Sequence, residues 1–155
     1  MIKVETVEEM KNAVLSACRG SDVLIMAAAA ADFRPTHSAQ DKLKRRNGVP
    51  QVEFEAAPDI LKEVVTIKNA KDRPRYIVGF AAESRDLLKN AAEKLKSKHL
   101  DLIVANDISE KGSGFSSDTN RVTLLFPDGK QEPLPLLPKS EVAEAVIEHI
   151  ARLVG

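Results

Sequence analysis

The stretch that decides the fold class is Val23-Leu24-Ile25-Met26-Ala27-Ala28-Ala29-Ala30-Ala31-Asp32. Its first four residues form an uninterrupted apolar run, which is typical of a strand buried on both faces of a sheet. Two further apolar runs, Tyr76 to Phe80 and Leu102 to Ala105, come later, and helical patterns separate the three runs. Crossovers of this length predict an α/β fold, in which a Rossmann-like parallel sheet is flanked by helices.

The helical segments are predicted from apolar residues that recur at helical spacing. Thr6 and Glu9 have the spacing of a capping box, so we expect the first helix to begin after Thr6 and to end near Gly20. Pro58 suits the first position of the second helix, and Ser140 is expected to cap the last one. A third helix is predicted between them, over about residues 87–95.

Three shorter segments have strand character. Ile2 to Val4 could be a strand remnant, and Val52 and Phe54 alternate with charged residues as a half-exposed strand does. Val122 to Phe126 ends in Pro127-Asp128-Gly129, and Asp-Gly after such a run is a strong hairpin signal. We therefore expect an antiparallel hairpin at one edge of the sheet.

Length and composition indicate one globular domain. The chain has 155 residues, and none of its apolar runs approaches the roughly 18 residues that cross a bilayer. Lysine plus arginine number 23, as do aspartate plus glutamate, which argues against nucleic acid or an anionic membrane as a partner. Cys18 is the only cysteine, so no internal disulfide is possible and the chain is expected to be cytoplasmic. Cys18 itself is expected to fill the core. The histidines have no ligand spacing, so no metal site is predicted.

Ligands of open α/β sheets collect beyond the carboxyl ends of the strands. Residues 27–32, 80–84 and 105–107 follow three predicted strands, so we expect these stretches to converge. The alanine run leaves the backbone uncovered, which suits the close approach of a base or a phosphate, although tight packing of a strand against a helix would use alanines equally well. Asp32 suits a ribose hydroxyl, a base amine or a magnesium–phosphate complex, but an aspartate also commonly caps a turn.

Two groups of basic residues are candidates for contact with phosphate. The basic run 42–46 lies in a stretch without periodicity, where a flexible lid could close over a polyphosphate. Most basic runs are solvated charged loops, and that alternative stays open. Lys94 and Lys98 lie four residues apart on one face of the third predicted helix, where they could bind phosphates or stabilise the helix dipole.

Six motifs follow one another along the chain: Ala29-Ala30-Ala31-Asp32-Phe33-Arg34-Pro35, Lys42-Leu43-Lys44-Arg45, Pro58-Asp59-Ile60-Leu61, Val78-Gly79-Phe80-Ala81-Ala82-Glu83, Asp101-Leu102-Ile103-Val104-Ala105-Asn106-Asp107 and Phe115-Ser116-Ser117-Asp118-Thr119-Asn120. In this order and spacing the chain resembles the bacterial phosphopantothenate–cysteine ligases (phosphopantothenoylcysteine synthetases), in their C-terminal portion. The resemblance covers nearly the whole chain, from about Ile2 to the final helix. Each motif alone is weak, whereas six in order are highly specific.

The resemblance implies a CTP-dependent ligation in coenzyme A synthesis. In that reaction the carboxylate of 4′-phosphopantothenate attacks the α-phosphate of CTP and pyrophosphate leaves. The amine of cysteine then displaces CMP from the acyl-cytidylate and forms an amide. Magnesium is expected to accompany the triphosphate. The resemblance also implies that the chain forms a homodimer.

The site residues that the resemblance implies follow from matching positions. The backbone of Met26, Ala27 and Ala28 would line the nucleotide, and Asp32 would contact CTP. Lys42 would be the catalytic lysine, which reaches the phosphates from a flexible lid of about residues 33–50. The remaining CTP-binding residues would form one wall and the basic side of the site: Pro58, Asp59, Ile60, Leu61, Phe80, Lys94 and Lys98.

The chain departs from the family at its N-terminus. Family members carry a glycine-containing loop and an asparagine that stabilises the acyl-cytidylate before the position of Ile2, and a flavin-dependent decarboxylase domain is often fused upstream. We therefore expect residues 1–155 to be a ligase domain truncated at its N-terminus, poorly active alone and without FMN. Two other functions stay open: a non-catalytic nucleotide-binding or dimerisation module, and a nicotinamide-dependent oxidoreductase, for which the glycine fingerprint is missing.

Overall fold

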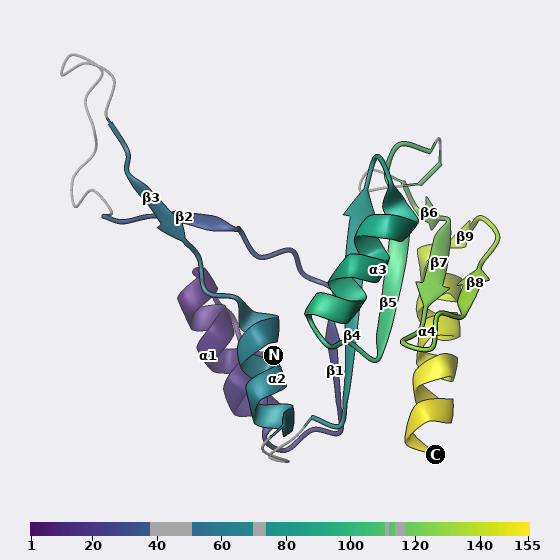
Figure 1. The fold of residues 1–155 in the computed structure, drawn as a ribbon, viewed down its shortest axis with the longest axis horizontal. Helices are drawn as coiled ribbons and strands as arrows, with labels where there is room; N and C mark the ends of the chain where they lie inside the picture. Colours follow the sequence, from purple (N-terminus) through teal and green to yellow (C-terminus); the bar gives the residue numbers. More distant parts are fainter. Residues whose placement is uncertain (38–50, 70–73, 111, 114–116) are drawn as a thin grey trace.

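The computed structural model describes residues 1–37, 51–69, 74–110, 112–113 and 117–155. Within these residues a five-stranded sheet forms the centre of the molecule, in the order β1-β4-β5-β7-β8 (Figure 1). β1, β4 and β5 are parallel to one another, β7 pairs antiparallel with β5, and β8 pairs antiparallel with β7. The predicted α/β class is therefore confirmed. The strands are β1 (Val23–Met26), β4 (Tyr76–Glu83), β5 (Leu102–Asp107), β7 (Val122–Leu125) and β8 (Gln131–Pro133).

Helices cover both faces of the sheet. Successive side chains of a strand point to opposite faces, so Ile77 belongs to one core and its neighbour Val78 to the other. The core around Ile77 is closed by α1, α2 and α3, and the core around Val78 is closed by α4. The helices are α1 (Val7–Cys18), α2 (Ile60–Asn69), α3 (Leu87–Ser97) and α4 (Lys139–Val154).

The start of α1 is set by its local sequence. The Thr6 Oγ1 accepts a hydrogen bond from the backbone N–H of Glu9 at 3.1 Å, and the Glu9 carboxylate accepts one from the Thr6 N–H at 3.3 Å. Both halves of the predicted capping box are therefore present. Cys18, the last residue of α1, is 2% exposed, which confirms its expected place in the core.

Two predicted helix starts were wrong. α2 begins two residues after Pro58, because the Asp59 carboxylate caps it by accepting from the Lys62 N–H at 3.2 Å. α4 begins directly after Pro138, so Ser140 lies inside its first turn instead of capping it. Pro138 ends a short strand with extended backbone, and the chain turns into the helix at the next residue.

β1 lies at the edge of the five-stranded sheet. Only Met26, at 8% exposed, is buried, whereas Ile25 is 40% exposed, so the prediction of a strand buried on both faces was wrong here. That prediction does hold for β5, whose first four residues, 102–105, are fully buried. An uninterrupted apolar run does not reveal whether a strand has a neighbour on each side.

Two short ribbons complete the fold. β2 (Phe33–Pro35) pairs with β3 (Phe54–Ala56), and β6 (Thr119–Asn120) pairs with β9 (Leu137–Pro138), both antiparallel. The β2–β3 ribbon projects away from the rest of the molecule (Figure 1). Its first strand is the start of the predicted lid, which is thus ordered there, while residues 38–50 lie outside the described residues. Ile2 to Val4 form no strand, and the predicted strand around Val52 begins two residues later, at Phe54.

The predicted hairpin at the sheet edge is confirmed. β7 and β8 pair antiparallel, and the turn between them is closed by hydrogen bonds from the Phe126 N–H to the Lys130 carbonyl and from the Gly129 N–H to the Phe126 carbonyl, both 3.0 Å. Gly129 has a φ of 87°, a conformation that glycine adopts without a steric penalty.

Candidate functional site

The parallel strands end at the same edge of the sheet, but β1 ends first. Met26, its last residue, is aligned with Gly79, whereas β4 and β5 continue together as far as Glu83 and Asp107. Phe80 is therefore the first residue of β4 beyond the end of β1. The sheet has a step at this point, and the alanine run leaves β1 there.

Lys94 reaches across this step from α3. Its Nζ donates a hydrogen bond to the Phe80 carbonyl oxygen at 2.8 Å, so two residues that were predicted to share a site are in contact. A carbonyl carries no formal charge, and two of the three ammonium protons of Lys94 stay available for other acceptors. The ammonium group of Lys94 is thus held at the carboxyl end of β1.

Lys98, four residues later, forms an ion pair with Asp59 at the start of α2. The same carboxylate accepts from the Lys62 N–H, so Asp59 joins the cap of one helix to the end of another. Burial works to raise the pKa of the Asp59 carboxyl, but the Lys98 ammonium and the Lys62 amide outweigh it and hold the pKa below its ordinary value. Asp59 is therefore a carboxylate at neutral pH.

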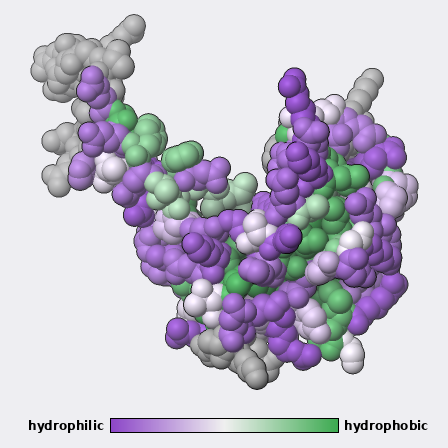
Figure 2. Space-filling model, viewed as in Figure 1, coloured by the Kyte–Doolittle hydropathy of each residue, from purple (hydrophilic) through white to green (hydrophobic). Residues whose placement is uncertain are grey.

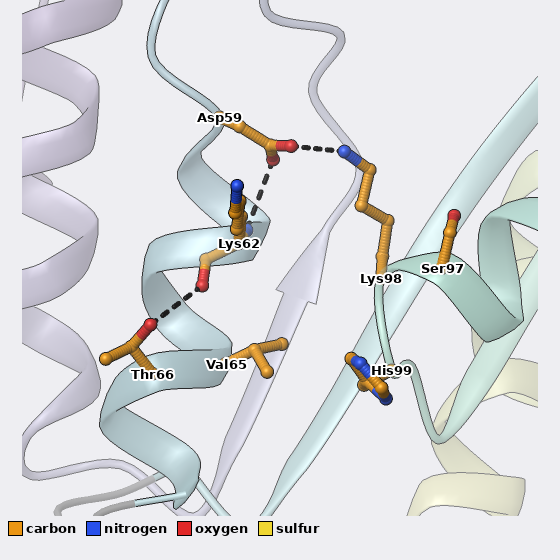
Figure 3. A pocket seen from close by; sticks show the side chains of 7 residues that line it. All are labelled: Asp59, Lys62, Val65, Thr66, Ser97, Lys98 and His99. Carbon is orange, nitrogen blue, oxygen red and sulfur yellow. Dashed lines mark hydrogen bonds and ion pairs between the residues drawn. The ribbon is translucent and has the colours of Figure 1, made fainter.

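A pocket of about 410 Å³ opens beside this ion pair, between α2 and the end of α3 (Figure 3). Its volume is within the range of small-molecule sites. Val65 provides an apolar wall, while the other side chains that line it carry hydrogen-bonding groups. The polar lining residues are Asp59, Lys62, Thr66, Ser97, Lys98 and His99.

The remaining predicted residues differ in how they can take part. The Asp32 carbonyl accepts from the Ala57 N–H at 2.9 Å, which brings the exposed Asp32 next to the segment that leads into Asp59. Ala27 and Ala28 are exposed, as a backbone-lined contact requires. Three other predicted residues have little side-chain surface to offer: Pro58 is half-buried, and Ile60 and Leu61 are buried in the core at 3% and 9% exposed.

Lys42, the predicted catalytic lysine, lies outside the described residues. Among the residues that the structure does describe, the predicted set forms two direct contacts, Phe80 with Lys94 and Asp59 with Lys98. Of the three stretches expected to converge, residues 80–84 and 105–107 lie side by side where β4 pairs with β5, whereas β1 ends level with Gly79 before either of them.

Sequence patterns did not predict most of the residues that line the pocket, namely Lys62, Val65, Thr66, Ser97 and His99. Lys62 and Thr66 lie four residues apart on α2, and Asp59 precedes Lys62 by three residues at the cap of the helix, so helical spacing alone places the three on one face. His99, on the opposite wall, has a φ of 47°, because it ends α3 in the left-handed conformation. The spacing along α2 was a usable signal, whereas nothing local indicates that the end of α3 faces it.

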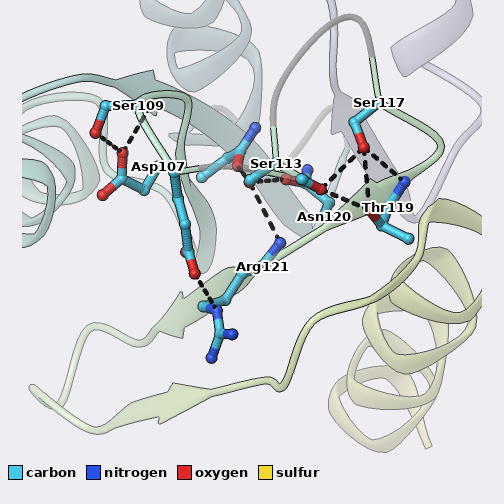
Figure 4. A network of polar contacts seen from close by, with 10 residues as sticks. Asp107, Ser109, Ser113, Ser117, Thr119, Asn120 and Arg121 are labelled. Carbon is cyan, nitrogen blue, oxygen red and sulfur yellow. Dashed lines mark hydrogen bonds and ion pairs between the residues drawn. The ribbon is translucent and has the colours of Figure 1, made fainter.

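A second group of polar contacts follows β5 (Figure 4). The Ser113 Oγ lies 2.8 Å from Asn106 Oδ1 and 2.5 Å from Asn120 Oδ1. A hydroxyl has one proton, so one of the two asparagines must turn its amide nitrogen toward Ser113. The next residue, Arg121, pairs with Glu110 at 2.9 Å. These bonds tie the connection after β5 to the start of β7.

The described residues contain no group of three or more histidine, cysteine, aspartate or glutamate side chains that could hold a metal ion. None of the helices in the described part of the chain is long and apolar enough to cross a membrane.

The sheet order and the ligand-sized pocket beside the strand ends define a Rossmann-like α/β domain with a candidate small-molecule site. The family model of the DNA/pantothenate metabolism flavoprotein C-terminal domain matches residues 1–154, and the chain belongs to this family.

Individual relatives agree with this assignment. The chain is 41% identical over 152 residues to the coenzyme A biosynthesis bifunctional protein CoaBC of Bacillus subtilis, covering 98% of this chain and 36% of that protein. It is 38% identical to a cysteine/cysteine sulfinic acid decarboxylase of an unknown prokaryotic organism, covering 99% of this chain and 42% of the relative. The chain thus spans less than half the length of these curated relatives.

Solved structures show the same fold. The crystal structure of the C-terminal domain of a coenzyme A biosynthesis bifunctional protein CoaBC superposes with a TM-score of 0.74 at 35% identity, covering 99% of this chain and 67% of that one. A DNA/pantothenate metabolism flavoprotein from Streptococcus pneumoniae has a TM-score of 0.76 at 19% identity, covering 98% of this chain and 72% of that one. The second likeness concerns the fold alone.

Proposed function

We propose that this chain forms the nucleotide-binding part of a CTP-dependent phosphopantothenate–cysteine ligase of coenzyme A biosynthesis. A carboxylate oxygen of 4′-phosphopantothenate attacks the α-phosphorus of CTP, and the bond to pyrophosphate breaks. The amine of cysteine then attacks the acyl carbon, loses a proton and expels CMP, which leaves an amide. Both steps are redox-neutral, so the proposed reaction requires no flavin. It would take place in the cytoplasm.

One observation carries the proposal. Lys94 of α3 donates to the carbonyl of Phe80, the first residue of β4 beyond the end of β1, and Lys98, the C-cap of the same helix, pairs with Asp59 at the start of α2. A ligand that lies beyond the end of β1 would meet ammonium donors, exposed backbone at Ala27 and Ala28, and the pocket beside α2. The relatives named as coenzyme A biosynthesis proteins support the choice of pathway.

Lys42 and magnesium have separate roles in the proposal. Lys42 would approach the triphosphate from the lid and stabilise the charge that develops on it, and catalysis would gain from this contact mainly in the transition state. Magnesium would enter with CTP as part of the substrate. It usually keeps waters and phosphate oxygens as ligands and needs one or two carboxylates at most, which the exposed Asp32 could supply.

Calorimetric titration of the chain with CTP, ATP and NAD tests the proposal. Selective binding of CTP supports it, binding of NAD would favour an oxidoreductase, and the absence of nucleotide binding would favour a purely structural module. Lys94→Met should weaken CTP binding by about tenfold to a hundredfold, the range for a lost charge-assisted hydrogen bond. Lys96→Met, which removes an exposed charge from the same helix, is the matched control and should leave the affinity unchanged.

The role of Lys42 needs a complete enzyme. A chimera of the Bacillus subtilis relative, in which residues 1–155 replace the corresponding domain, would provide one. Lys42→Ala in this chimera should slow formation of the acyl-cytidylate far more than it weakens CTP binding. An unchanged rate of pyrophosphate release would refute the lid role.

We also propose a homodimer that forms through the β2–β3 ribbon. The register Phe33 to Ala56 and Pro35 to Phe54 puts four apolar residues on one face of the ribbon, and Phe33 and Phe54 are 66% and 63% exposed. Figure 2 shows hydrophobic surface on this projecting part. A two-stranded ribbon is marginally stable alone, so a second copy of the chain that covers this face would stabilise it.

The opposite face of the ribbon is polar and turned toward α1. Arg34 donates to Glu55 at 2.8 Å across the ribbon and pairs with Glu8 of α1 at 3.3 Å. The apolar face is therefore the one left for a partner. This feature also favours the second candidate function, a dimerisation module without catalysis, which the nucleotide titration distinguishes from the ligase.

A further inference from the structure

His149 lies between the last helix and the hairpin at the edge of the sheet. It belongs to α4, which closes the core around Val78, so it is on the opposite side of the sheet from the candidate pocket. Its ring reaches Glu132 of the edge strand β8 and packs beside the Phe126 ring, with 5.8 Å between the ring centroids. The His149 side chain is only 12% exposed. The imidazole is therefore held between α4 and the β7–β8 hairpin.

Both ring nitrogens of His149 face oxygen atoms that only accept hydrogen bonds. Nδ1 lies 2.8 Å from the Ala145 carbonyl oxygen, and Nε2 lies 3.2 Å from each oxygen of the Glu132 carboxylate. A neutral imidazole carries one N–H, so in either tautomer one of its nitrogens would direct a lone pair at an oxygen. Only the imidazolium, which has a proton on each nitrogen, donates to both partners.

The charges around the ring leave Glu132 as its anionic partner. The Lys130 ammonium, and after it His149, hold the pKa of the Glu132 carboxyl below its ordinary value of 4.5, so Glu132 is ionised at neutral pH. Lys130 shares this carboxylate at 3.1 Å, and Glu148 and Arg152 of α4 pair with each other. The other strands close to α4, which are β6, β7 and β9, contain no charged side chain.

We propose that a proton on His149 operates a clasp between α4 and the β7–β8 hairpin. The charged imidazole joins the Ala145 carbonyl of the helix to the Glu132 carboxylate of the edge strand. Loss of the proton removes one donor and turns a lone pair toward an acceptor, so the clasp opens while Lys130 stays paired with Glu132. An imidazole changes charge between about pH 5 and pH 8, so the clasp responds to pH in the physiological range.

A double-mutant cycle followed by urea unfolding tests the clasp. His149→Leu removes both donors and Glu132→Gln removes the anion, so at pH 6 the double variant should lose less stability than the two single variants added together. We expect a coupling of about twofold to fivefold in the equilibrium constant of unfolding, the range of a partly exposed ion pair. The coupling should disappear at pH 8.5, where the imidazole has lost its proton, and shrink at pH 3, where the carboxyl has gained one.

Two controls separate this effect from other consequences of pH. Lys130→Met in a cycle with Glu132→Gln tests the same carboxylate against a cation that does not titrate in this range, so its coupling should be equal at pH 6 and pH 8.5. His37→Leu removes an exposed histidine, and its effect on stability should also be equal at both. If the coupling of His149 to Glu132 is absent at pH 6, or as large at pH 8.5 as at pH 6, the clasp is wrong. The proposed ligase function would stand, because neither residue lines the candidate pocket.

Discussion

Gly79 is a residue whose role depends on contact with a distant part of the chain. A Cβ at this position would lie 2.6 Å from Cδ1 of Leu100, which is buried at 3% exposed and has little room to move. Gly79→Ala should therefore destabilise the protein by about 1–3 kcal/mol, the usual cost of overpacking a core. The midpoint of urea unfolding measures this change.

Two further variants separate overpacking from a general effect of replacing glycine. Gly20→Ala is the control, because nothing lies within 4 Å of a Cβ at that position, and it should not destabilise the protein. Leu100→Val shortens the side chain that clashes, so the double variant with Gly79→Ala should lose less stability than the two single changes added together. Additive losses would contradict the clash.

The start of a helix depends on the side chains that cap it, and in α1 one of these side chains, the Glu9 carboxylate, titrates. The contribution of this cap to stability should therefore depend on pH. The Glu9 carboxylate accepts from the backbone N–H groups of Glu5 and Thr6, and these bonds lower its pKa below the ordinary 4.5. A carboxyl whose pKa is lower in the folded state adds stability above its unfolded pKa and loses it as the pH falls through the folded value.

The difference in unfolding free energy between the wild type and Glu9→Ala should therefore be full at pH 7 and should shrink as the pH falls below 4.5. Thr6→Ala should cost about 1 kcal/mol as a lost helix cap. Because the Thr6 hydroxyl does not titrate, much of that loss should persist in acid. A Glu9→Ala difference that is equally large at pH 7 and pH 3 would contradict the capping role of the carboxylate.

The cap of α2 predicts a difference between two substitutions at one position. Asp59→Ala removes the acceptor for the Lys62 N–H and should cost about 1 kcal/mol, whereas Asp59→Asn keeps an acceptor and should cost only a few tenths. Thermal or urea unfolding of both variants checks this. Equal losses would mean that the ion pair with Lys98, rather than the cap, is the main contribution of Asp59 to stability.

In the whole molecule, the β2–β3 ribbon exposes an apolar face that no other part of the described chain covers. If the apolar face is a dimer interface, Phe33→Ser and Phe54→Ser together should raise the dimer dissociation constant at least tenfold, as the loss of two aromatic anchors does. Sedimentation equilibrium measures this constant. Ile147→Ser is the control, because Ile147 is also exposed, at 53%, but lies on α4.

A dissociation constant that is unchanged by the two ribbon substitutions would rule out this interface. Weaker dimers with Ile147→Ser would instead locate the interface on α4. Circular dichroism of each variant should match that of the wild type, since all three residues are exposed and their loss leaves the core intact.

Sequence patterns correctly predicted the order of the helices and of the strands in the central sheet, the capping box of α1 and the β7–β8 hairpin, but not the short strands β2, β6 and β9. These features depend on residues within a few positions of one another, so the local pattern contains the physical cause. Two errors of the sequence-based prediction were also local. Pro58 and Ser140 are good helix starters by type, but Asp59 and the end of a strand at Pro138 took precedence.

Contacts between side chains that are far apart in the chain depend on the packing of whole elements. Lys98 and Asp59 are 39 residues apart, and Lys94 and Phe80 are 14 apart, so no local period connects them. The edge position of β1 and the apolar face of the β2–β3 ribbon follow from strand pairing, which a single run of residues does not encode. The strand-end rule directs attention to the carboxyl ends of the strands, whereas the candidate pocket is lined by residues of α2 and of the segment that ends α3.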